Sequence, residues 1–143
     1  IQNTLALARE TGDYAAFRQR FYAERILPGS AMLDARETVP VALALVYLAE
    51  GDPRQTIILG ANFGRDADTI ASMAGALSGA PHGAPALPAE WIAKIRANSR
   101  RDQSALAAML VAVSQQRAAD QAHRVRQIQT LQPLPINLKE PQP

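Results

Sequence analysis

Residues 60–83 read GANFGRDADTIASMAGALSGAPHG and join an acidic turn to a helix of very small side chains. Asp66, Asp68 and Thr69 bring two carboxylates and a hydroxyl together, shortly after the turn-forming Gly64. Side chains two positions apart point to nearly opposite sides of a regular helix, so the carboxylates share a target only if the helix begins here. We therefore predict a helix from Asp66 to about Ala80, with Asp66 on the incoming turn.

Two interpretations of the acidic residues remain open at this point. In the first, Asp66 is a helix N-cap and Asp68 is a first-turn acid stabilised by the positive end of the helix dipole. In the second, the two carboxylates and the Thr69 hydroxyl form part of a metal site. All three are oxygen donors, which suit magnesium, manganese or calcium and not zinc or copper.

The segments around this turn follow one another as Glu37-Thr-Val-Pro40, Glu50-Gly-Asp-Pro53, Asn62-Phe-Gly64-Arg-Asp66-Ala-Asp68-Thr69, Ala74-Gly75-Ala76, Gly79-Ala80 and Leu87-Pro88-Ala-Glu-Trp91. In order and spacing they resemble the carboxyl-terminal half of the ADP-ribosylglycohydrolase family. The resemblance covers roughly residues 37–95.

The resemblance implies an all-helical domain that holds two magnesium ions, or manganese, in a cleft. Such a domain hydrolyses the bond between ADP-ribose and a protein side chain or small acceptor. The resemblance also implies that Asp66, Asp68 and Thr69 are metal ligands. It implies that the general base and the remaining ligands come from an amino-terminal half upstream. Many members have Gly where this chain has Arg65, so Arg65 either contacts a substrate phosphate or faces solvent. Gly64 and Arg65 are the candidate substrate-binding residues.

The number of donors agrees with an incomplete site. Two carboxylates neutralise one divalent ion, and three protein ligands leave room for water and substrate, as in an open catalytic site. A second ion needs further acids, for which Glu37 is a weak candidate because capping is its more common role at a helix start. We therefore expect this chain alone to be inactive, with the missing half of the domain as its partner.

A non-catalytic role is the alternative. The family resemblance extends to lens crystallins, which use the fold as a structural protein. The Gln- and Arg-rich segment 103–131 would also suit a helical assembly module.

Composition narrows the class of protein. The 143 residues are 48% hydrophobic but only 5% aromatic, which favours one domain of closely packed Ala-rich helices. The net charge is +2 without a basic stripe, so nucleic acid is not expected as a partner. Cysteine is absent, and no apolar run is long enough to cross a membrane. We expect a cytoplasmic protein whose substrate is an ADP-ribosylated protein or a small ribosyl conjugate.

The predicted architecture is all-α. We expect a multi-helix domain over residues 1–131 and an extended Pro-rich tail over 132–143. Asp13 and Asp52 should cap helices, and Pro28-Gly29-Ser30 should form a turn. Residues 103–131 should form one long helix or two.

Three further expectations concern packing. Tyr14, Phe17, Phe21 and Tyr22 fall at helical spacing and should lie in the core. A buried helix should run from Glu37 to about Ala49, with Thr38 as its cap and Pro40 in its first turn. Gly75 and Gly79, four residues apart in the acidic helix, should mark a close helix crossing; His82 should lie in the following loop.

Overall fold

The computed structural model describes residues 1–24 and 34–130, and every regular element in these ranges is helical. The predicted all-α class is therefore confirmed. The expected turn at Pro28-Gly29-Ser30 and the Pro-rich tail lie outside the described residues. The elements in chain order are α1 (Gln2–Thr11), α2 (Tyr14–Glu24), α3 (Ala35–Leu48), α4 (Pro53–Ala61), α5 (Ala67–His82), a 3-10 turn (Ala84–Ala86), α6 (Ala89–Asn98) and α7 (Gln103–Thr130).

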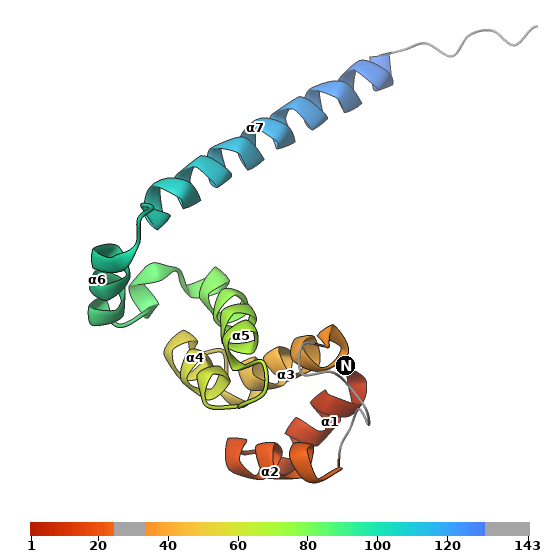
Figure 1. Ribbon diagram of the computed structural model, residues 1–143. Coiled ribbons are helices and arrows are strands. Elements are labelled where there is room, and N and C mark those ends of the chain that lie inside the picture. The colour runs from red at the N-terminus through yellow and green to blue at the C-terminus, as the bar shows by residue number, and fades with distance from the viewer. Residues whose placement is uncertain (25–33, 131–143) are drawn as a thin grey trace, which may run out of the picture. The chain divides into compact units, whose positions relative to one another are not determined.

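The chain divides into two compact units, residues 1–94 and 95–143, which are described separately. In the first unit, α5 packs against both α3 and α4, and α1 packs against α2 and α3 (Figure 1). The core of this unit consists of apolar side chains from α1, α2, α3, the α4–α5 turn and α5. Its buried members are Leu7, Ala8, Phe17, Phe21, Val41, Ala44, Leu45, Phe63 and Ile70.

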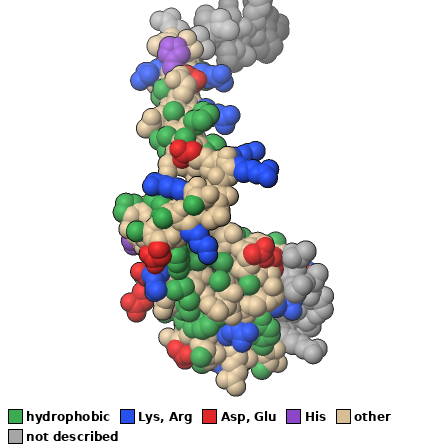
Figure 2. Space-filling model, turned by 60° about the vertical axis from the view of Figure 1, so that its left-hand side comes forward, with side chains coloured by type: hydrophobic (Ala, Val, Ile, Leu, Met, Phe, Trp, Pro, Cys, Tyr) green, Lys and Arg blue, Asp and Glu red, His purple; other side chains and the backbone are tan. Residues whose placement is uncertain are grey.

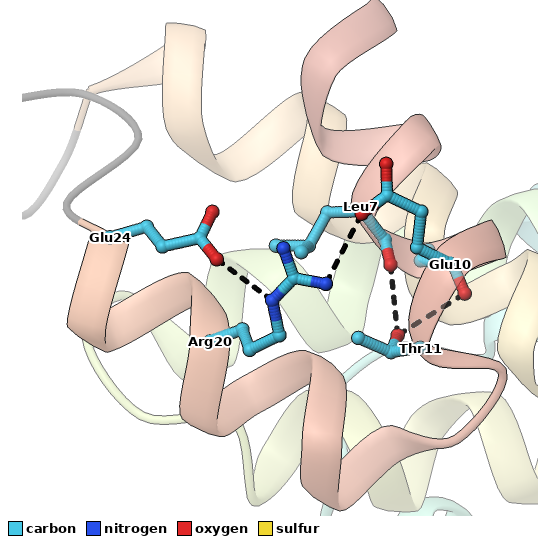
Figure 3. A network of polar contacts seen from close by, with 6 residues as sticks. Leu7, Glu10, Thr11, Arg20 and Glu24 are labelled. Carbon is cyan, nitrogen blue, oxygen red and sulfur yellow. Dashed lines mark hydrogen bonds and ion pairs between the residues drawn. The ribbon is translucent and has the colours of Figure 1, made fainter.

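The aromatic side chains of α2 only partly follow the expectation. Phe17 and Phe21 are buried, and Tyr14 is half-buried against the core. Tyr22 is 39% exposed and packs its ring against Phe63. The opposite side of α2 is polar, and its Arg20 joins Glu24 on the same helix to Glu10 of α1 (Figure 3).

Side-chain caps fix where most of the helices begin. Asp13 accepts a hydrogen bond from the Ala16 amide (3.0 Å), and Asp52 accepts one from the Gln55 amide (2.6 Å), as predicted. The buried helix that was predicted to begin at Glu37 begins earlier, at Ala35, so that prediction is wrong at its start. Asp34 caps this helix, α3, because its carboxylate accepts a hydrogen bond from the Arg36 amide (2.8 Å).

The earlier start of α3 changes the role of the residues that follow. Thr38 lies inside the helix and is buried, so it is not the cap. Pro40 lies beyond the first turn, where its missing N–H removes a helical hydrogen bond to the Arg36 carbonyl. Helix α5 continues through Pro81 and ends at His82. His82 therefore does not lie in a loop.

Helix α5 crosses α4 closely, but only one of the two glycines expected at the crossing, Gly75, lies close to α4. A Cβ on Gly75 would lie 2.9 Å from Ile57 Cγ1, whereas one on Gly79 would meet nothing within 4 Å. The closest approach is at Gly60 of α4, where a Cβ would lie 2.7 Å from the Ala71 Cα. Small residues at the crossing therefore determine the spacing of α4 and α5.

In the second unit, α7 is a single continuous helix of 28 residues, and its described residues are all exposed. Asp102 caps it by accepting hydrogen bonds from the Ser104 and Ala105 amides. Figure 2 shows both apolar and basic side chains along this helix. Met109, Leu110 and Ile128 are among its most exposed apolar residues. None of the helices in 1–24 and 34–130 combines the length and apolar character needed to cross a bilayer.

Candidate metal site at the start of helix α5

The acidic residues lie at a tight reversal between α4 and α5. Helix α4 ends at Ala61, and Asn62 is its C-cap. Gly64 and Arg65 both have positive φ angles, 94° and 54°, so the backbone turns sharply before α5. For Arg65 this left-handed conformation costs about 1–2 kcal/mol. The turn must therefore be held in place by contacts with other parts of the first unit.

The first of these contacts is at Phe63. Its side chain is fully buried and its ring packs near the rings of Phe17, Phe21 and Tyr22, with centroids 5.4–6.0 Å away. Its carbonyl accepts hydrogen bonds from Arg18 Nε (2.8 Å) and from the Tyr22 hydroxyl (3.0 Å). Helix α2 thus binds the turn through both the side chain and the main chain of one residue.

The second contact is an ion pair between Arg65 and Glu37. Glu37 lies in the first turn of α3 and is only 4% exposed, while the Arg65 side chain is partly exposed. The Arg65 Nε lies against Glu37 Oε1 and offsets the charge of this buried carboxylate. Asp34, not Glu37, caps α3, so the expected capping role of Glu37 is wrong. The pairing also means that Arg65 does not simply face solvent.

The three predicted metal ligands occupy the amino-terminal end of α5. Asp66 occupies the N-cap position and is 8% exposed, yet its carboxylate makes no capping hydrogen bond. Its backbone carbonyl accepts the bond from the Ile70 amide (3.0 Å) that starts the helix. Asp68 and Thr69 lie in the first turn and are exposed. The convergence of their three oxygens on one ion stays a prediction.

The donor set fits a hard cation in composition and is partial in number. A nearly buried carboxylate at the positive end of a helix, without the capping bond that would explain it, is an arrangement that a bound cation would complete. Within residues 1–24 and 34–130, no group of three or more His, Cys, Asp or Glu side chains is placed to hold a metal. His82 Nδ1 lies 2.8 Å from the Ser78 carbonyl, so that nitrogen is engaged within α5.

Sequence reasoning missed Arg18 and Tyr22 as parts of this region. Their contact with Phe63 spans 45 and 41 positions along the chain, and no local pattern reports such a pairing. The available signal was their own spacing. An arginine and a tyrosine four residues apart share one face of a helix, and this face adjoins the buried aromatic side chains.

Comparison with known proteins extends the similarity beyond residues 37–95. The model of the family described as ADP-ribosylglycohydrolase matches residues 1–120 of the chain. The uncharacterized protein YegU of Escherichia coli (strain K12) is 43% identical over 83 residues, which are 58% of this chain and 25% of that protein. The chain thus spans about a quarter of the length of this curated relative. No solved structure gives a significant match.

Proposed function

The chain belongs to the ADP-ribosylglycohydrolase family, and from this membership we propose that it supplies part of a magnesium-dependent hydrolase. The enzyme cleaves the glycosidic bond that joins ADP-ribose, or a related ribosyl group, to an acceptor. The acceptor is a protein side chain or a small molecule, and the reaction takes place in the cytoplasm. This chain contributes the acidic turn before α5 to the metal site.

One observation carries the proposal most directly. Asp66 has the position of a helix cap without the hydrogen bond of one, although it is nearly buried. Asp13, Asp34 and Asp52, which precede other helices of the same unit, all make their capping bonds. The interpretation of Asp66 as an ordinary cap therefore lacks support, and the interpretation as a ligand gains it.

In the mechanism, Asp66, Asp68 and Thr69 would hold magnesium, and further ligands would come from other parts of the complete family domain. When bound, the ion would supply electrostatic stabilisation at the reacting bond. The amino-terminal end of α5, where these residues lie, carries the positive end of the helix dipole. Gly64 and Arg65 form the adjoining backbone, where we place the nearest contacts to substrate.

A non-catalytic assembly role is the second candidate, and α7 is the observation that favours it. Apolar side chains such as Met109, Leu110 and Ile128 are 63–66% exposed along this helix. Exposed apolar residues in such number are typical of a surface that another protein covers. On this alternative the acidic turn would only join α4 to α5, and the protein would hydrolyse no substrate.

The test is release of free ADP-ribose by the full-length protein from ADP-ribosylated substrates, with magnesium and with a chelator. Asp66→Asn and Asp68→Asn should each lose most of the magnesium affinity and the turnover, while the helical circular-dichroism signal stays nearly unchanged. Asp52→Asn is the matched control, because it removes a carboxylate from another helix start and leaves a side chain that still caps. Wild-type turnover in the Asp68→Asn protein would refute the metal role.

A further inference from the structure

The carbonyl of Phe63 lies three positions before Asp66 and receives two hydrogen bonds from helix α2. We propose that Arg18 and Tyr22 are positioning residues for the metal-binding acids, because they fix the turn from which Asp66 and Asp68 emerge. This inference rests on the proposed function of those acids. It assigns α2, which carries none of the proposed ligands, a role in metal affinity.

The two donors form one unit on the surface of α2. They are four residues apart, so they lie on the same face of the helix. The Arg18 guanidinium carbon is 4.9 Å from the centre of the Tyr22 ring, and this cation–π contact orients both side chains. Their polar groups then meet the same oxygen, at 2.8 and 3.0 Å. A carbonyl oxygen has two lone pairs, so both bonds are accommodated.

The hydrogen bonds from Arg18 and Tyr22 restrict the backbone of the turn next to Gly64. Gly64 directly follows the hydrogen-bonded carbonyl of Phe63, and a glycine can adopt many backbone conformations. The Tyr22 hydroxyl also occupies the space beside Gly64, since a Cβ there would lie 2.6 Å from it. With the Phe63 ring buried and its carbonyl bound, the peptide plane between Phe63 and Gly64 has a fixed orientation. Arg65 is held by Glu37 on the other side, so Asp66 enters α5 in one defined direction.

The less specific alternative is that the bonds from Arg18 and Tyr22 to Phe63 only stabilise the fold. Helix α2 offers a matched control in Arg20, which bonds to Glu24 (2.8 Å) and Glu10 (3.1 Å) on its polar side. Figure 3 shows that this network joins α1 and α2, and none of its bonds reaches the α4–α5 turn. Loss of Arg20 therefore weakens the α1–α2 pair without releasing Phe63.

The experiment compares Tyr22→Phe and Arg18→Gln with Arg20→Gln in the full-length protein. The first readout is hydrogen exchange of the Ile70 amide without metal, because this amide bonds to the Asp66 carbonyl. The second is the magnesium dissociation constant from titration calorimetry. Tyr22→Phe keeps the ring and removes one hydrogen bond. We expect it to raise the exchange rate of the Ile70 amide and the magnesium dissociation constant by about three- to tenfold each, the range for one lost hydrogen bond. Exchange is normalised to each variant's global stability, and Arg20→Gln should leave both values near wild type.

Two results would count against the inference, and they are distinguishable. If Asp66→Asn weakens magnesium binding but Tyr22→Phe matches Arg20→Gln in both readouts, the positioning role is refuted and the proposed function stands. If Asp66→Asn binds magnesium as tightly as wild type, the proposed function fails and the inference fails with it.

Discussion

Gly64 is the residue whose replacement should reveal most about the acidic turn. Its φ of 94° strains any L side chain, and an added Cβ would lie 2.6 Å from the Tyr22 hydroxyl. Gly64→Ala should therefore lower the free energy of unfolding by about 1–2 kcal/mol through backbone strain. It should lower it by about 1 kcal/mol more because the hydrogen bond from Tyr22 to Phe63 is displaced. Urea unfolding monitored by circular dichroism gives the free energies.

The control for Gly64→Ala is Gly12→Ala at the end of α1. Gly12 also has a positive φ, 67°, but nothing lies within 4 Å of its added Cβ, so only the strain should appear. Measured against the Tyr22→Phe protein, which already lacks the hydroxyl and its bond to Phe63, Gly64→Ala should cost only the strain. Equal losses in the two alanine variants would show that Tyr22 does not restrict this turn.

Asp34 provides a residue-scale prediction for pH. The hydrogen bonds from the Arg36 guanidinium, followed by the bond from the Arg36 amide, lower the pKa of Asp34 from 3.8 to about 2. Because the pKa is lower in the folded state, this stabilisation is fully present above pH 3.8 and is lost as the pH falls through about 2. Carboxyl NMR titration should show the pKa rising toward 3.8 in Arg36→Gln. Arg54→Gln, on α4, should leave it unchanged; an unchanged value in Arg36→Gln would contradict the assignment.

Local chemistry explains which residue roles were predictable. Asp13 and Asp52 were identified as caps because a cap bonds to amides two or three residues away. Thr38 was a wrong prediction, because Asp34 accepts the same kind of bond four residues earlier and starts α3 sooner. Neither the Glu37–Arg65 pair nor the bonds from Arg18 and Tyr22 to Phe63 could be foreseen, since folding alone brings these residues together.

At the scale of elements, the crossing of α4 and α5 should respond differently to two glycine substitutions. Gly60→Ala places a Cβ 2.7 Å from the Ala71 Cα, and a backbone atom cannot move aside without shifting a helix. We expect a loss of about 1–3 kcal/mol from overpacking, larger than the helix-propensity gain of about 1 kcal/mol. Gly79→Ala meets nothing within 4 Å and should stabilise the protein by about 0.5–1 kcal/mol. Urea unfolding of both variants tests this, and a stabilised Gly60→Ala protein would contradict the close crossing.

The sequence predicted that small residues would allow a close approach, but not which of them would form it. The spacing of Gly75 and Gly79 indicates a shared helix face, yet only Gly75 approaches α4, and a Cβ on Gly79 would meet nothing within 4 Å. Gly60 gave no such signal, because it is the single glycine of a nine-residue helix. Crossing points depend on how two helices meet, which a pattern on either helix alone leaves undetermined.

At the scale of the molecule, helical periodicity and the absence of strand patterns were enough to predict an all-α fold. The proposed ligand set stays a prediction, and the sequence names only part of it. Asp66, Asp68 and Thr69 are adjacent in sequence, so any helix that starts at Ala67 brings them to the same end. Under the proposed function, the remaining donors of a six-coordinate ion come from segments distant in sequence, and the family match over residues 1–120 does not identify them.

This incompleteness leads to a prediction for magnesium and stability. The full-length protein should gain about 2.7 kcal/mol of unfolding free energy at a magnesium concentration of 100 times its dissociation constant, because the ion binds only the folded state. The acidic turn offers three of the six oxygens that an octahedral ion requires, so we expect the same magnesium concentration to shift the thermal unfolding of residues 1–143 alone much less. Differential scanning calorimetry with and without magnesium makes the comparison, and Asp68→Asn should abolish the shift in the full-length protein. If residues 1–143 alone were stabilised as strongly as the full-length protein, the acidic turn would hold a complete site, and the two-part metal centre would have to be abandoned.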